Sequence, residues 1–214
     1  MSGEHQRILE MLAAGKLAPA EAERLLAALR RPRARPGLWL FQPLELLPTH
    51  IALLVGVAAA AAGLLLSLLR IRFDGALDLH LVDAQVPWSV ALVDHFLAWP
   101  ATALVLWGAA RLVARQGRFV DFLAAVGVAR VPLVLAAALV GGVGARFDQV
   151  DQGAVPPAVV VVALLTLPFV AWFVALLVTG MRTAAGLRGA RLAAAAVGGI
   201  VAAEILTKLA LLAI

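Results

Sequence analysis

The sequence contains no cysteine and no tyrosine, and only two of its 214 residues, Lys16 and Lys208, are lysines. The absence of cysteine excludes disulfides, thiolate zinc sites, iron–sulfur clusters and cysteine nucleophiles. Charged residues make up only 14% of the chain and hydrophobic residues 63%, whereas a soluble domain is about a quarter charged and about half apolar. This composition excludes an ordinary soluble enzyme and a disordered chain. A lipid bilayer, in contrast, accommodates that much apolar surface.

Catalytic motifs are missing as well. Ser2, Ser67 and Ser89 have no accompanying His and Asp arrangement, and the chain contains neither a Walker A motif nor a G-x-G-x-x-G phosphate loop. We therefore predict a protein that is not an enzyme and that holds no cofactor.

Five long apolar blocks occupy most of the chain, at residues 49–69, 88–110, 120–144, 155–180 and 192–213. Each reaches the ~20 residues that a hydrocarbon span requires. The run from 55 to 66 shows none of the alternation of a β-barrel strand, so helices are favoured. The pattern predicts an all-α, polytopic integral membrane protein with five transmembrane helices. Because the first block follows a long polar tail, no cleaved signal peptide is expected.

Basic residues are distributed unevenly among the links between the blocks, which predicts the orientation. The tail, the second link and the fourth link carry most of them: Arg7, Lys16, Arg24, Arg30, Arg31, Arg33, Arg35, Arg111, Arg115, Arg118, Arg182, Arg188 and Arg191. The other two links carry Arg70, Arg72 and Arg146. We predict a multi-pass protein of the cell inner (plasma) membrane with a cytoplasmic N-terminus and an outer C-terminus.

The polar tail, residues 1–32, reads as a cytoplasmic helix–turn–helix segment. Gly15 suits the end of one helix and Pro19 the start of the next. The apolar faces predicted to pack as a hairpin are Ile8, Leu9 and Leu12 on the first helix and Leu25, Leu26 and Leu29 on the second. The stretch resembles the SHOCT-like segments that begin several bacterial envelope proteins. A protein contact, oligomerisation and a passive cap are all open, whereas DNA binding is disfavoured because two short helices lack a third to pack on.

Residues 33–48 form a basic linker followed by an interfacial segment. The basic run begins at the end of the preceding segment and consists of Arg30, Arg31, Arg33 and Arg35, with prolines interrupting it. Beside a bilayer each arginine attracts anionic headgroups by ~1 kcal/mol, or serves only to set topology. The apolar residues that follow place Trp39 at headgroup depth.

Several motifs between residues 38 and 213 resemble a bacterial member of the Yip1 family. They are Trp39-x-x-x-Pro43, Arg118-Phe-Val-Asp-Phe122, Gly127-Val-Ala-Arg-Val-Pro132, Trp172, Gly180-Met-Arg182 and Gly186-Leu187. The resemblance implies a Yip1-like five-helix transmembrane domain over 49–214 behind a cytoplasmic N-terminal region. Eukaryotic relatives carry an Asp-Leu-Tyr-Gly-Pro stretch and bind Rab GTPases, but this chain has no tyrosine, so that role is not carried over. Arg130 stands where an apolar residue is more usual.

Four ionisable residues lie inside the predicted spans: Asp94, Arg130, Glu204 and Lys208. Intramembrane charges are costly and mark functional sites by default. Arg130 and Glu204 are expected ~15 and ~18 Å from the same membrane face, so they could meet. We predict a polar network Asp94–Lys208–Glu204–Arg130. It serves either as a relay or polar substrate site, or as a structural ion-pair cluster that joins the second, third and fifth spans.

Weaker signals accompany this network. Acidic outer loops with His80 carry no metal-binding spacing, so a solvated acidic face is favoured over a metal site. Prolines at 100, 132 and 168 predict kinks or, less readily, broken transporter helices. Small-residue pairs such as Gly56/Ala60 and Ala195/Gly199 permit close helix contact.

Two functions follow from these patterns. The first is a non-enzymatic membrane organiser or adaptor. Its hairpin would bind a protein partner, and its spans would self-associate or bind other membrane components. The second is a small transporter or channel that uses the polar site around Arg130 and Glu204. Transport requires water to reach those residues, whereas an organiser would seal them in helix packing.

Overall fold

The computed structural model describes residues 3–30, 38–73, 75–77, 79–82, 84–143 and 157–212. The chain divides into two compact units, Met1–Pro36 and Gly37–Ile214. Arg31, Arg33, Arg35 and the acidic residues Asp74, Asp78, Asp83, Asp148 and Asp151 lie outside the described residues, as does the side chain of Arg30.

The N-terminal unit contains the two predicted helices, α1 (Gly3–Ala13) and α2 (Pro19–Arg30). Gly15 adopts a φ of 66° between them, a left-handed conformation that suits the residue after a helix end. Ile8 and Ala22 are buried, but Leu9 and Leu25 are 40% and 42% exposed. The prediction that each leucine-rich face packs as a whole is therefore only partly right. Adjacent residues such as Ile8 and Leu9 point ~100° apart on a helix, and here the partner helix covers Ile8 but not Leu9.

Among its described residues, the second unit contains five helical segments long and apolar enough to cross a membrane, which confirms the predicted all-α, five-helix membrane fold. They are α4 (Thr49–Ser67), the joined α5 (Trp88–Phe96), η2 (Leu97–Ala101) and α6 (Thr102–Ala114), α7 (Phe119–Val143), α8 (Pro157–Ala185) and α9 (Gly189–Leu212). Pro100 lies within η2, a π-helical turn, whereas Pro132 and Pro168 lie inside continuous α-helices. The second span therefore changes its helical geometry at Pro100 but continues as one helix, and no proline breaks a described span as in a broken transporter helix.

Four short elements complete the described part of this unit. Before α4 lie the single-turn helices α3 (Leu38–Phe41) and η1 (Pro43–Glu45). Between α4 and α5, the strands β1 (Ile71–Arg72) and β2 (His80–Leu81) pair antiparallel, with Ile71 opposite Leu81.

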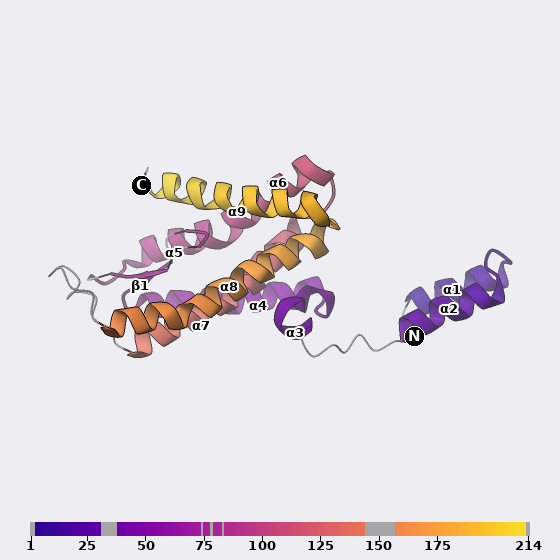
Figure 1. Cartoon of the computed structure of the whole chain (residues 1–214), viewed down its shortest axis with the longest axis horizontal. Helices are drawn as coiled ribbons and strands as arrows, with labels where there is room; N and C mark the ends of the chain where they lie inside the picture. The colour runs from indigo at the N-terminus through magenta and orange to yellow at the C-terminus, as the bar shows by residue number, and fades with distance from the viewer. Residues whose placement is uncertain are drawn as a thin grey trace. The chain divides into compact units, whose positions relative to one another are not determined.

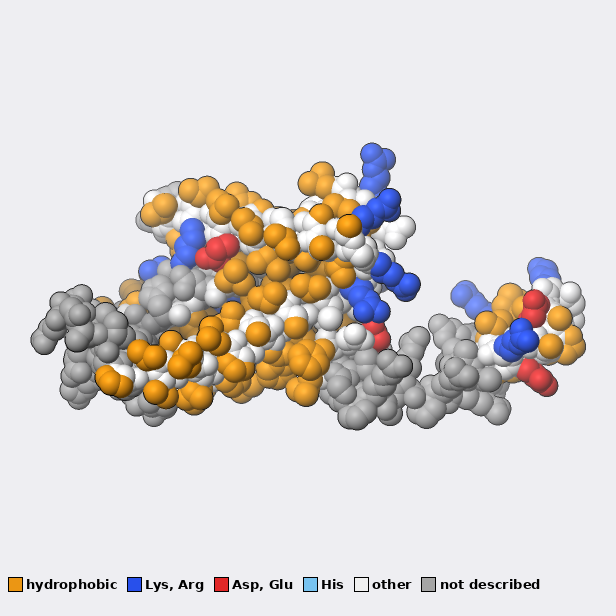
Figure 2. Space-filling view, in the orientation of Figure 1, with side chains coloured by type: hydrophobic (Ala, Val, Ile, Leu, Met, Phe, Trp, Pro, Cys, Tyr) orange, Lys and Arg blue, Asp and Glu red, His pale blue; other side chains and the backbone are white. Residues whose placement is uncertain are grey.

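Helix α7 lies at the centre of the second unit, where it packs against α4 on one side and α8 on the other (Figure 1). Helix α6 packs mainly against α9. The largest buried cluster joins α6, α7 and α8 through Leu106, Phe122, Leu133, Phe173 and Met181. Large apolar side chains on the outer faces of α4, α8 and α9 are exposed, as expected of surfaces that face lipid (Figure 2).

Candidate functional site

Glycines bring α4 and α7 into close contact at the middle of the bundle. A Cβ atom added at Gly127 would lie 2.8 Å from the Cα atom of Gly56, and one at Gly56 would lie 2.9 Å from the Cα atom of Gly127. Trp99 covers this contact, and its indole Nε1 donates a hydrogen bond to the Leu123 carbonyl at 2.7 Å. Small residues are what lets two helix backbones approach this closely. The contact fixes α7 against α4 beside the π-helical turn.

Arg130 is anchored at that turn. Its side chain is buried, with 4% exposed, and its Nη1 donates to the Ala98 carbonyl at 3.2 Å. In a regular α-helix the amide of Thr102 would bond to that carbonyl, but here it bonds to Leu97 and Trp99 instead. The π-helical turn therefore frees a carbonyl inside the membrane unit, and Arg130 supplies its donor.

Two aromatic rings continue from Arg130. Its guanidinium lies 5.5 Å from the ring centroid of Phe73, a distance at which a cation–π interaction forms. The Phe73 ring in turn meets the His95 ring edge-on at 5.2 Å. His95 Nδ1 donates to the Ala91 carbonyl at 2.9 Å, and the opposite edge of the imidazole fills the space where a Cβ of Gly63 would lie. These three side chains form a continuous buried stack.

Asp94 pairs with Arg72. Arg72 Nε lies 2.8 Å from Asp94 Oδ2, and Nη2 lies 3.2 Å from Oδ1, so the pair is bidentate. The side chain of Asp94 is 1% exposed and that of Arg72 is 29% exposed. Beside the pair lies a cavity of about 240 Å³, lined by Arg72, Asp94, Ser89, Val90, Val93 and Leu211. Sequence reasoning assigned Arg72 only to topology and did not find this pair.

Glu204, on α9, binds the link between α4 and α5, which also contains Arg72. Its Oε2 accepts the backbone N–H of Leu77 at 2.9 Å. Lys208, one turn further along α9, is half-buried and is not without a partner. The contacts described here connect Asp94, Arg130 and Glu204 to groups outside the four-residue network, so direct pairing within that network stays a prediction.

The link between α4 and α5 consequently folds back among the helices. Ile71, Phe73 and Ala76 are 0%, 1% and 1% exposed. As candidate site residues, sequence reasoning considered only the acidic residues and His80 of this link, whose side chains lie outside the described part of the chain, and it did not foresee the burial of the apolar ones. The signal that could have revealed it is the set of apolar residues at 71, 73, 76 and 77 between the charged ones. Among the described residues, no three His, Asp or Glu side chains lie close enough together to hold a metal ion.

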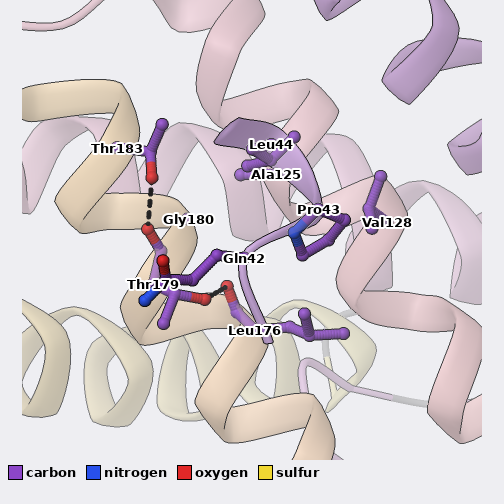
Figure 3. A pocket seen from close by; sticks show the side chains of 9 residues that line it. All are labelled: Gln42, Pro43, Leu44, Ala125, Val128, Leu176, Thr179, Gly180 and Thr183. Carbon is purple, nitrogen blue, oxygen red and sulfur yellow. Dashed lines mark hydrogen bonds between the residues drawn. The ribbon is translucent and has the colours of Figure 1, made fainter. Parts of the chain in front are cut away.

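The segment before α4 docks on α8. Trp172 Nε1 donates to the Leu40 carbonyl, and Thr179 Oγ1 donates to the Phe41 carbonyl at 2.6 Å. These bonds satisfy carbonyls at the end of α3 that have no helical partner. Figure 3 shows Pro43 and Leu44 lying between α7 and α8. Trp172 is ~20 Å along the axis from the end of α8, so the predicted interfacial segment reaches into the bundle.

The Yip1 domain family matches the chain over residues 27–212. The chain belongs to the Yip1 domain family. It is a multi-pass membrane protein, and the apolar helices of its Yip1 domain contact the bilayer. The match begins inside α2, so most of the N-terminal hairpin precedes it, and the SHOCT-like assignment of that hairpin stays a resemblance. No curated protein and no solved structure matches the chain.

The motifs that carry the Yip1 resemblance have structural roles. Gly127 makes the close contact with α4, and Trp172 holds α3. A Cβ at Gly180 would lie 2.8 Å from that of Ala125, so this glycine admits α7 against α8. Asp121, at the start of α7, accepts a hydrogen bond from Thr49 Oγ1 at 3.1 Å. Gly127 and Gly180 therefore set distances between helices, and Trp172 and Asp121 bond one segment to another.

Proposed function

We propose that this Yip1 protein is a non-enzymatic organiser or adaptor of the inner membrane, with its N-terminus in the cytoplasm. The hairpin of α1 and α2 binds a protein partner. The five spans self-associate or bind other membrane components. Nucleic acid is not among the partners.

The burial of the intramembrane charges supports this proposal over transport. Arg130 and Asp94 are 4% and 1% exposed, and each is bonded to a group of the protein itself. Glu204 is half-buried and bonded to a backbone amide. A transport site must exchange these bonds for bonds to substrate or water, whereas an organiser needs them to hold its helices in place.

The exposed apolar residues of the hairpin support an adaptor role. Leu9, Met11 and Leu25 are 40%, 39% and 42% exposed. A two-helix hairpin of this size buries little, so a partner that covers these residues would stabilise it.

Photo-crosslinking tests the adaptor role. A photoreactive residue at Leu9 is expected to give a discrete adduct in cells, and the same residue at buried Ala22 is expected to give none. If the exposed and buried positions give the same background, the hairpin is not a recruitment site and the adaptor proposal fails.

The transport alternative makes the opposite prediction about water access. Because the chain has no cysteine, single cysteines can be introduced on a clean background. Suitable positions are Ala129, next to Arg130 in the chain, and Ala98, whose carbonyl Arg130 binds; these alanines are 0% and 1% exposed. We expect a small water-soluble thiol reagent to leave both unlabelled while it labels the exposed control Ser89→Cys. Labelling of the first two at the control rate would favour a water-filled pathway.

A further inference from the structure

The two turns at one end of the membrane unit lie against each other. One turn joins α6 to α7 and contains Gln116 and Gly117; the other joins α8 to α9 around Gly186. A Cβ at Gly117 would lie 3.0 Å from the Ala184 carbonyl oxygen, and one at Gly186 would lie 3.9 Å from Gln116 Oε1. The side chains that flank both turns therefore belong to one continuous surface.

Arginines surround this surface. They are Arg111, Arg115, Arg118, Arg182, Arg188 and Arg191, and all six are exposed. Within the part of the chain that the structure describes, none of the six forms an ion pair. Figure 2 shows Lys and Arg side chains gathered at the end where α8 gives way to α9. Six guanidinium groups with no carboxylate partner attract an anion.

Helix packing places arginines of α6 and α9 at similar heights. Gly199 of α9 packs on Leu106 and Ala109 of α6. From that contact, Arg115 lies ~9 Å along α6 and Arg191 lies ~12 Å along α9 toward the same end. Two guanidinium groups from different helices can therefore face one bound group.

The position of Arg111 is fixed before any ligand arrives. Its guanidinium lies 5.5 Å from the ring centroid of Trp107. Trp107 is itself held, because its Nε1 donates to the Gly117 carbonyl at 3.2 Å and its ring meets Phe119 edge-on at 6.0 Å. An arginine stacked on a fixed aromatic ring keeps its N–H groups available for a phosphate oxygen at little entropic cost.

We propose that this surface, the six arginines with Trp107, binds the phosphate headgroups of anionic phospholipids. Arginine forms bidentate hydrogen bonds with phosphate. Directly beside Arg111, Leu112 is 89% exposed and Val113 is 37% exposed. An apolar surface next to a phosphate site matches a lipid, whose acyl chains begin at its headgroup, better than it matches free phosphate or an acidic peptide. Trp107 has the position expected of an interfacial tryptophan.

Lipid binding to the purified full-length protein tests this assignment. The protein in neutral detergent is titrated with phosphatidylglycerol or phosphatidylcholine, and retained lipid is measured by native mass spectrometry. We expect preferential retention of phosphatidylglycerol. R191Q, which changes an exposed side chain, should weaken it by about fivefold, and R111Q/R188Q/R191Q by about a hundredfold, because each basic residue adds a similar increment.

Two controls make the result decisive. R70Q removes one exposed arginine after α4, at the opposite end of the bundle, and should leave lipid retention unchanged. Excess inorganic phosphate should not displace the lipid. Equal retention of the two lipids, or equal losses in R70Q and R191Q, would overturn the proposal. Full displacement by inorganic phosphate would show a free-anion site instead of a lipid site.

Discussion

Asp94 on α5 and Arg72 at the end of β1 form a bidentate ion pair, although 21 residues separate them in the chain. The pair ties the link between the first two spans to the second span. Arg130 and Glu204 touch the same link at Phe73 and Leu77, from α7 and α9 respectively. Three intramembrane charges on three helices thus hold one irregular segment inside the bundle.

Removing Arg72 should destabilise the protein strongly. R72Q leaves the Asp94 carboxylate buried without its cation, and we expect a loss of about 3 kcal/mol in the free energy of unfolding. D94N/R72Q should cost less than the sum of the two single changes, because the pair is lost only once. Unfolding in detergent micelles measures both effects. R70Q is the control, since Arg70 is exposed, and additive single effects would argue against the pair.

The glycine contact predicts a position-specific effect of one methyl group. In G127A the new Cβ would lie 2.8 Å from the Gly56 Cα atom, so a backbone must move. Overpacking of this kind costs about 1–3 kcal/mol in the free energy of unfolding. G108A adds the same methyl group where nothing lies within 4 Å, and it should be neutral or slightly stabilising. Equal melting temperatures for the two variants would contradict this packing.

Loss of the Glu204 carboxylate should release the link between α4 and α5. In E204A the Leu77 amide loses its acceptor, which costs about 1–3 kcal/mol for a buried donor. E204Q retains a carbonyl oxygen and should behave almost as the parent protein. Labelling of Ala76→Cys reports the change directly, because Ala76 is 1% exposed. We expect slow labelling in the parent and in E204Q and fast labelling in E204A; the same rate in all three would show that Glu204 does not hold the link.

The distribution of arginines predicts which side of the membrane each link occupies. Gln116, in the arginine-rich turn, and Gln85, between β2 and α5, are both exposed. An impermeant thiol reagent added to intact cells should label Gln85→Cys and spare Gln116→Cys until the membrane is opened. The reverse order would place the N-terminus outside.

The positions of the spans could be predicted closely because what makes a segment span the membrane is a property of its own sequence. Each needs ~20 consecutive apolar residues whose backbone bonds close within the segment. Pro100 was a weak signal in the sequence, and the structure places it in the π-helical turn that frees the Ala98 carbonyl for Arg130. The small-residue pair Gly56/Ala60 predicted a close helix contact, and Gly56 makes one, but only the structure shows that its partner is Gly127 of α7.

The sequence by itself determined the five helices and the N-terminal hairpin, and it placed the four intramembrane charges within the spans. These follow from composition and from the fixed rise of a helix along its axis. Only the tertiary structure decided the partners: Arg72 for Asp94, the Ala98 carbonyl for Arg130 and the Leu77 amide for Glu204. Depth does not determine how a helix is rotated about its axis. Nor does composition show that a polar link will fold back into the bundle, where every buried backbone group must find a bond.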